Sequence, residues 1–306
     1  MGTTVGIAGI TSRVALCAVR QLLKRPDVYI RGYCRNPNKL PVQVSSHPRV
    51  QLLQGQFDDG IALRSLVKGC DVVICSYLAD DNNVMVEGQK LLIDLCVEEG
   101  VPRYIPSDYT IEFPKLRLGQ FIKKNPMIQI NEYLESKNIK AAHILVGIFM
   151  ETLFSDLLYI WDPKERTIQY YGSGDEVLEL STYDTAGRYL AAVAVDPEAV
   201  GFLRFLGDRK STNQIISDFR SVYGTEPAVK RLGSLDDLYQ EAHANGEQHY
   251  AKTGLHHILT GAVYLEGDLD CGRYPDVKPE TMQDLFKQHP ISQLHQALDL
   301  VATKWD

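Results

Sequence analysis

The sequence lacks long apolar runs, clusters of basic residues and closely spaced cysteines. None of its apolar stretches approaches the roughly 20 residues that a membrane-spanning helix needs. Its formal net charge is −7 and no lysine- or arginine-rich run offsets this, so we expect no nucleic-acid partner and no membrane partner. The six cysteines form no CxxC pair. We therefore expect reduced thiols, no metal site and no disulfide framework.

The composition is that of an ordinary soluble protein. Hydrophobic residues make up 44% of the 306 residues and charged residues 23%. A chain of this length buries enough apolar surface to fold without disulfides. A strand pattern begins almost at once, which leaves no room for an export signal. We expect a cytoplasmic protein, and the sequence leaves its oligomeric state open.

Strand and helix patterns alternate over the first half of the chain. Short β-branched runs occur at 4–8, 28–34, 50–53, 72–76, 103–106 and 143–146. Amphipathic stretches lie between them at 14–24, 62–68, 84–99 and 126–136. Strands that are apolar on both faces and alternate with helices indicate a parallel sheet covered on both sides. The pattern predicts an α/β fold with a Rossmann-like, doubly wound parallel sheet.

The second half is less regular. Two strand-like runs flank the turn Gly172-Ser173-Gly174 and predict a hairpin of residues 167–171 and 177–180. A strand is expected at 202–206, and helices at 183–195, from Ser211, and at 235–244, 252–260 and 291–304. We expect a dinucleotide-binding domain over 1–150 and a smaller α+β substrate-side region over 151–306. Later strands are free to rejoin the main sheet.

A small-residue turn follows the first strand. Gly6, Gly9, Ser12 and Ala15 recur at intervals of three residues in GIAGITSRVA. A dinucleotide-binding turn needs small residues there, because the backbone must approach a pyrophosphate and the helix must pack close to the strand. Ser12 departs from glycine, although its hydroxyl can cap the helix or donate to a phosphate. A structural strand–helix turn without a ligand is the alternative.

Positive charge follows the second strand. Arg35 and Lys39 stand there, and no carboxylate lies between Arg31 and Lys39. An NAD-binding site usually has an acidic residue at this point for the ribose hydroxyl, whereas a guanidinium suits the 2′-phosphate of NADP(H). The pattern favours NADP(H), with Arg13 as a second candidate phosphate ligand. A solvated surface arginine is the alternative.

Five segments in order resemble one known family. They are GIAGITSRVA, CRNP, EEGVPRYIPSDY, HILVGIFME and TYDTAGRYLAAVAVDP. Together they resemble the NmrA-like and isoflavone-reductase-like branch of the atypical short-chain dehydrogenases, in its fungal form, over roughly residues 1–235. The last 70 residues or so resemble nothing specific.

The resemblance implies a Rossmann-like fold that binds NADP(H). It places Gly9, Thr11, Ser12, Arg13 and Val14 at the pyrophosphate and Arg35 and Lys39 at the 2′-phosphate, and Asn36 is a further cofactor-binding candidate. Further cofactor positions are Gly6, Gln56, Ser76, Tyr77, Ser107, Gly147 and Phe149. Gln56 stands where the family has an acidic residue.

The resemblance also bears on catalysis. Reductases of the family use a lysine at the start of the helix before the sixth strand, and Met127 takes its position here. Lys123 and Lys124 lie just upstream, in a loop that Asn125 as N-cap and Pro126 are expected to close. Lys123 is the candidate donor, with two solvated loop lysines as the alternative.

Other candidates lie at the strand ends. Asp108 and Tyr109 could act as acid and hydrogen-bond donor, and Tyr109, Phe149, Met150 and Tyr171 could line a substrate pocket. The YxxxK pair Tyr133 and Lys137 sits too late in its helix to be catalytic.

Three functions remain open from the sequence. The leading hypothesis is an NADPH-dependent reductase of a small aromatic or conjugated carbonyl compound, in fungal secondary metabolism. Met127 favours a second hypothesis, a non-catalytic NADP(H)-binding redox sensor. A redox-neutral isomerase or cyclase on the same fold is the third.

Overall fold

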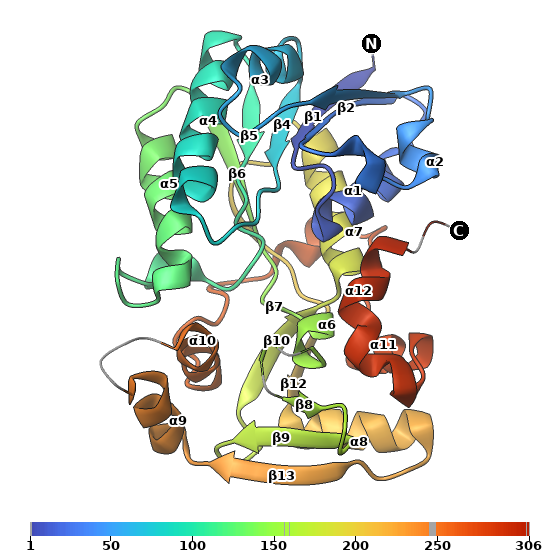
Figure 1. Ribbon diagram of the computed structural model, residues 1–306, viewed down its shortest axis with the longest axis vertical. Coiled ribbons are helices and arrows are strands. Elements are labelled where there is room, and N and C mark those ends of the chain that lie inside the picture. Colours follow the sequence, from blue (N-terminus) through green and yellow to red (C-terminus); the bar gives the residue numbers. More distant parts are fainter. Residues whose placement is uncertain (1, 156, 159, 245–248, 304, 306) are drawn as a thin grey trace.

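A computed structural model describes residues 2–155, 157–158, 160–244, 249–303 and 305. Its largest element is a sheet of seven parallel strands in the order β11-β6-β5-β4-β1-β2-β3 (Figure 1). The strands are β1 (Thr3–Ala8), β2 (Val28–Cys34), β3 (Val50–Gln54), β4 (Val72–Cys75), β5 (Arg103–Ile105), β6 (Lys140–Leu145) and β11 (Gly201–Arg204). This sheet confirms the predicted Rossmann-like α/β class.

Helices cover both faces of the large sheet (Figure 1). One face carries α3 (Gly60–Val67), α4 (Gly88–Glu98) and α5 (Asn125–Glu135), and the other carries α1 (Arg13–Leu22) and α7 (Tyr183–Val195). Every residue of β4 is buried, as expected for a strand between two helical layers. The helices α1 and α7 approach so closely at Gly187 that a Cβ there would lie 2.3 Å from the Cβ of Cys17. The short α2 (Val42–Ser45) lies beside β3.

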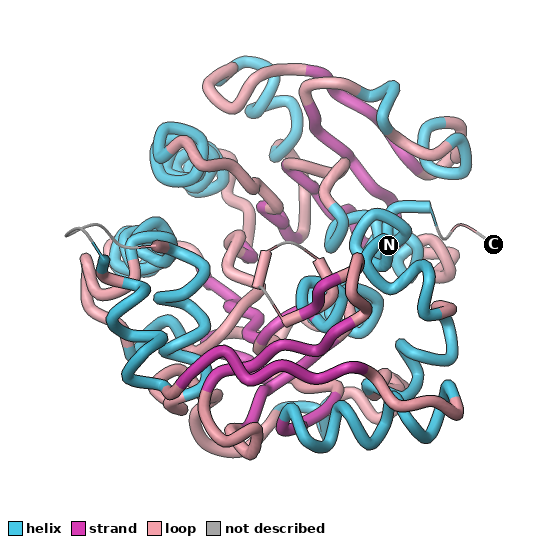
Figure 2. Tube along the Cα trace, turned by 60° about the horizontal axis from the view of Figure 1, so that its bottom comes forward, coloured by secondary structure: helices cyan, strands magenta, loops and turns pink. Residues whose placement is uncertain are grey.

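Two three-stranded sheets form the lower part of the molecule (Figures 1 and 2). Their strands are β7 (Ile148–Phe149), β8 (Trp161–Asp162), β9 (Thr167–Tyr171), β10 (Val177–Ser181), β12 (Asp208–Ser211) and β13 (Ala228–Gly233). Their helices are α6 (Met150–Leu153), α8 (Thr212–Tyr223), α9 (Leu235–Ala242), α10 (Tyr250–Leu259), α11 (Met282–Gln288) and α12 (Ala297–Leu300). A second apolar core lies among these elements. The strand β11 belongs to the large sheet although it follows residue 200, and the division at residue 150 stays a prediction.

The predicted hairpin of residues 167–171 and 177–180 is wrong. Both strands exist, but β9 pairs with β13 and β8, whereas β10 pairs with β12 and β7. The turn between them is held by the carboxylate of Glu176, which accepts hydrogen bonds from the backbone N–H groups of Ser173 and Gly174. The chain thus passes through this turn from one small sheet to the other.

Two predicted helices also differ from the structure. The helix expected at 84–99 begins with a π-helical stretch, Asn83–Glu87, before α4. The helix expected at 291–304 is a run of short turns, in which α12 lies between the 3-10 segments Ile291–Gln296 and Val301–Thr303. Among the described helices, none is long and apolar enough to cross a membrane.

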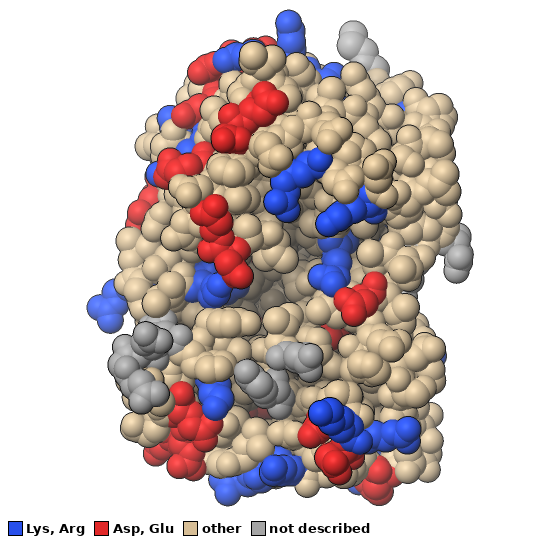
Figure 3. Space-filling model, in the orientation of Figure 1, with Lys and Arg blue, Asp and Glu red and all other residues tan. Residues whose placement is uncertain are grey.

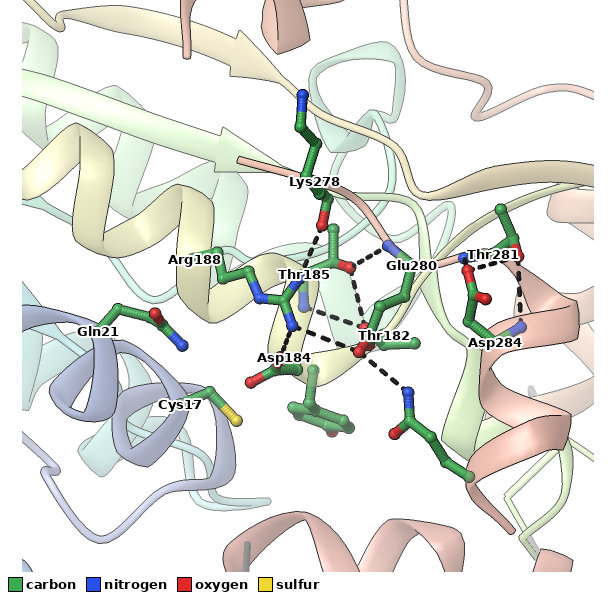
Figure 4. A network of polar contacts seen from close by, with 12 residues as sticks. Cys17, Gln21, Thr182, Asp184, Thr185, Arg188, Lys278, Glu280, Thr281 and Asp284 are labelled. Carbon is green, nitrogen blue, oxygen red and sulfur yellow. Dashed lines mark hydrogen bonds and ion pairs between the residues drawn. The ribbon is translucent and has the colours of Figure 1, made fainter. Parts of the chain in front are cut away.

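A polar network ties the C-terminal part of the chain to α7 (Figure 4). Thr182 caps α7 by accepting from the backbone N–H of Thr185 at 3.0 Å, and its own hydroxyl donates to Glu280. Arg188 donates to the carbonyl oxygen of Lys278 at 2.7 Å and pairs with Asp184. The segment before α11 is therefore fixed against the helix that packs on α1.

Candidate cofactor and substrate site

The turn after β1 is pressed against the end of β4. Gly9 has a φ of 81°, which favours glycine, and its N–H donates to the carbonyl oxygen of Tyr33 at 2.9 Å. A Cβ on Gly9 would lie 2.5 Å from the carbonyl oxygen of Ser76. Gly6 lies within β1, where a Cβ would come within 3.1 Å of Cys70 Sγ. The turn thus has the tight backbone that the sequence predicts.

Ser12 joins this turn to both α1 and β4. It is the N-cap of α1, with Oγ accepting from the N–H of Ala15, and the same oxygen lies 2.6 Å from Oγ of Ser76. Thr11 is partly buried and Val14 is buried beside it. The turn therefore directs the positive end of the α1 dipole toward the carboxyl ends of β1 and β4, where an anionic group is stabilised.

Arg13, the first residue of α1, contacts the C-terminal part of the chain. Its Nη2 lies 3.0 Å from Oδ1 of Asp299 on α12. The arginine side chain is 35% exposed and the aspartate side chain 78% exposed. This exposed ion pair contributes little to stability, so the guanidinium can exchange its partner for an anionic ligand.

The end of β2 presents unpaired positive charge. Arg35, Asn36 and Lys39 are exposed, and among the described residues neither cation forms an ion pair. The backbone there is held, because Asn36 Oδ1 accepts from Asn38 N–H and Gln54 Nε2 donates to Arg35 O. Basic side chains lie around the hollow in the middle of one face of the molecule (Figure 3).

Two tyrosines, Tyr33 on β2 and Tyr77 just after β4, are buried at the strand ends. The hydroxyl of Tyr33 donates to the carbonyl oxygen of Gln56 at 2.6 Å, so the backbone of Gln56 is fixed while its side chain is exposed. The hydroxyl of Tyr77 is buried and has no hydrogen-bond partner among the described residues. Burial raises the pKa of Tyr77 above its ordinary value, so the phenol stays neutral.

Ser107 and Tyr109 hold neighbouring strand ends together. Ser107 Oγ donates to the carbonyl oxygen of Tyr77 at 2.6 Å, and Tyr109 Oη donates to that of Cys75 at 2.9 Å. Both hydroxyl groups therefore donate their hydrogen bonds to backbone carbonyl oxygens. This arrangement stiffens the strand ends around which the predicted site is built.

The predicted substrate residues do not all lie together. Phe149 stacks on Tyr183, with ring centroids 3.8 Å apart, beside Gly147, whose φ is 69°. Met150 is fully buried in the lower core, and Tyr171, also in that core, donates its hydroxyl to Glu241. Of the predicted set, Tyr109 and Phe149 thus lie near the large sheet, and Tyr183, which stacks on Phe149, was not predicted.

The two adjacent lysines lie in different environments. Lys123 forms an exposed ion pair with Asp80, with Nζ and Oδ1 2.6 Å apart. Lys124 is partly buried, and its Nζ donates to Thr110 Oγ1 at 2.7 Å. Burial lowers the pKa of Lys124 to about 8.

The start of α5 differs from the predicted one and explains this contrast. A 3-10 segment, Ile122–Lys124, precedes the helix, and Lys124 rather than Asn125 is the N-cap. Lys124 therefore stands at the start of the helix before β6, while Met127 packs against an apolar cluster one turn later. The one signal in the sequence that favours Lys124 over Lys123 is that Lys124 lies one residue closer to the start of the helix.

Asp108 is paired with a residue that the sequence did not single out. Asp108 Oδ2 lies 2.5 Å from Nδ1 of His143 on β6, and both side chains are almost wholly buried. Burial raises the pKa of Asp108 above its ordinary value, and the nearby imidazole opposes this shift. By contrast, Tyr133 and Lys137 both contact Asp94 on α4, away from the strand ends.

A model of the NmrA-like family matches residues 1–243. An isoflavone reductase of Pisum sativum is 22% identical over 259 residues, which cover 78% of each chain. The complex of AtPrR2 with NADP+ and (+)-pinoresinol superposes with a TM-score of 0.78 at 19% identity, covering 94% of this chain and 99% of that one. The complex of leucoanthocyanidin reductase from Vitis vinifera with NADPH gives a TM-score of 0.74 at 17% identity, covering 93% and 98%.

Proposed function

The chain belongs to the NmrA-like family, and we propose that it is an NADPH-dependent reductase of a small aromatic or conjugated carbonyl compound. Reductases are among its relatives, and similar structures hold NADP+ or NADPH. A role in fungal secondary metabolism stays a prediction. The observation that carries the proposal is the partly buried ammonium of Lys124 at the start of α5, bonded to Thr110.

The residues present fit NADP(H). The Gly9 turn leaves no room for a Cβ, and the N-terminus of α1 offers a positive dipole end to a pyrophosphate. Arg35 and Lys39 form no ion pair within the described part of the chain and suit a 2′-phosphate, since a guanidinium binds phosphate oxygens in a bidentate manner. Arg13 would exchange Asp299 for a phosphate oxygen.

When bound, NADPH supplies a hydride to the substrate, and the protein must supply the proton. Lys124 can do so, because burial lowers its pKa to about 8, close to the ideal value for a general acid near neutral pH. Thr110 accepts the hydrogen bond that orients Nζ. The rings of Phe149 and Tyr183 offer an aromatic wall to a planar substrate. We assign the proton donor's role to Lys124 rather than to Lys123, Asp108 or Tyr109.

The test is NADPH oxidation against a panel of conjugated carbonyl compounds, with Lys124→Met compared with Lys123→Met. Loss of a general acid lowers kcat by roughly 10²–10⁴-fold, so we expect that loss for Lys124→Met, with NADPH affinity retained. Lys123→Met removes an exposed ion pair and should change kcat by less than about twofold. Equal effects of the two substitutions on a measurable rate would reject the assignment.

A redox sensor is the second candidate, because Met127 cannot donate a proton at the position of the family lysine. A sensor would bind both NADP+ and NADPH and oxidise NADPH with no compound of the panel. Steady NADPH consumption with any of them would exclude it.

A further inference from the structure

The buried pair of Asp108 and His143 is poorly explained by folding alone. Asp108 Oδ1 is buried and has no hydrogen-bond partner among the described residues, although Oδ2 contacts His143. A buried carboxylate with an unsatisfied oxygen is costly, because burial removes the water that stabilises its charge. Well-packed apolar side chains are often at least as stable in such a position.

The pair lies next to the proposed proton donor. Thr110, two residues after Asp108, accepts the hydrogen bond from Lys124, and its backbone bridges to Leu145 on β6, two residues after His143. Of the charged side chains that the structure describes, Asp108 is the one whose field raises the pKa of Lys124.

The other carboxylates in this region have cationic partners of their own. Asp80 pairs with Lys123 at 2.6 Å, and Glu112 pairs with Arg204 on β11. The positive charges of Lys123 and Arg204 thus largely compensate these two carboxylates, so they act only weakly on Lys124. Lys124 also lies near the ring of Phe121, whose centroid is 5.9 Å from Nζ.

The imidazole of His143 is held in place by aromatic packing. Its ring stacks on Phe202, with centroids 4.4 Å apart, and Phe113 lies at 6.4 Å. A fixed ring keeps Nδ1 directed at Asp108. The geometry therefore presents a buried carboxylate that, among the described residues, contacts one side chain, the imidazole of His143.

We propose that Asp108, held by His143, is a positioning residue that keeps the ammonium of Lys124 protonated and bonded to Thr110. The proposal rests on the role of Lys124 as proton donor. In this proposal Asp108 touches neither substrate nor cofactor. Its negative charge acts on the ammonium of Lys124.

The direction of the effect follows from the two opposing influences on Lys124. Burial lowers the pKa of Lys124, and the carboxylate of Asp108 opposes this. Removing the carboxylate should therefore lower the pKa further. Removing His143 should act in the same direction, because the imidazole favours the charged form of Asp108.

The experiment measures the ionisation of Lys124 directly in the folded chain, without substrate or cofactor. Trace labelling with acetic anhydride between about pH 6 and pH 11, followed by peptide mass spectrometry, gives the titration midpoint of each lysine. For Asp108→Asn we expect the midpoint of Lys124 to fall by at least about half a pH unit, which is less than the shift of about 1–3 units expected for an opposite charge in direct contact. Labelling of Lys124 at neutral pH should then rise about threefold or more.

Two further variants make the result specific. Asp80→Asn removes the carboxylate beside Lys123 and should shift the titration of Lys123 but not that of Lys124. His143→Phe keeps the stacking on Phe202 and should lower the midpoint of Lys124, which provides a second test if Asp108→Asn does not fold. An unchanged midpoint of Lys124 in a folded variant of Asp108 or His143 would overturn the proposal. Because no turnover is measured, failure of the reductase assay and failure of this test are distinguishable.

Discussion

Replacing Gly9 with alanine should destabilise the protein more than the same change at Gly100. Both glycines have a positive φ, 81° and 69°, so alanine pays a left-handed backbone penalty of roughly 1–2 kcal/mol at either position. At Gly9 the new Cβ would also lie 2.5 Å from the carbonyl oxygen of Ser76 and 2.9 Å from its carbon. These are backbone atoms of a central strand end and cannot rotate away. At Gly100 no atom lies within 4 Å of the Cβ position.

The clash at Gly9 adds the cost of overpacking, about 1–3 kcal/mol. We therefore expect Gly9→Ala to lower the free energy of unfolding by about 2–5 kcal/mol and Gly100→Ala by about 1–2 kcal/mol. Urea unfolding followed by circular dichroism measures both variants against the parent protein. If the two losses agree within about 0.5 kcal/mol, the turn is not packed against β4 as described.

Two other perturbations test the packing around the sheet. Arg103 is buried and donates to the carbonyl oxygens of Val193, Ala194 and Ala199. The substitution Arg103→Met removes all three of these buried hydrogen bonds and should therefore cost about 3 kcal/mol or more in urea unfolding. A loss below about 1 kcal/mol would contradict this network. Burial raises the pKa of Cys17 and Cys75 to about 12, and Cys271 alone of the six cysteines is not fully buried. A thiol reagent at about pH 8 should therefore modify at most one cysteine quickly in the folded protein and all six in urea, and rapid reaction of two or more would show that the fold is more open.

The large sheet was predictable because its signals are local. Each strand is a short apolar run. The run VVIC of β4 is apolar at every position, which predicts a strand covered by helices on both faces, and all four of its residues are buried in the structure. The helix α7 begins and ends where the pattern predicts, since Thr182 caps it. Such features depend on neighbours within a few residues.

The small sheets were less predictable because their pairing is not local. The strand β9 pairs with β13, about 60 residues later in the chain, and nothing in the spacing of β9 and β10 excludes a hairpin. Only the tertiary contacts of the two strands decide between the two arrangements.

The site shows the same division. The tight turn at Gly9 and the charge at Arg35 follow from residue types at known points of a strand–helix pattern. The choice between Lys123 and Lys124 depends on one 3-10 turn that moves the helix start by a single residue. The partner of Asp108 is a histidine on another strand, 35 positions away, and no spacing rule connects the two.

The binding of NADPH and NADH to the parent protein, Arg35→Ala and Arg25→Ala, measured by titration calorimetry, tests the central claim most directly. Arg25 is an exposed arginine just before β2 and serves as the matched control. We expect NADPH to bind the parent protein, Arg35→Ala to weaken NADPH by about 1.5–3 kcal/mol while NADH is barely affected, and Arg25→Ala to change neither. Equal losses for both dinucleotides, or no measurable affinity of the parent protein for NADPH, would contradict the proposed cofactor site.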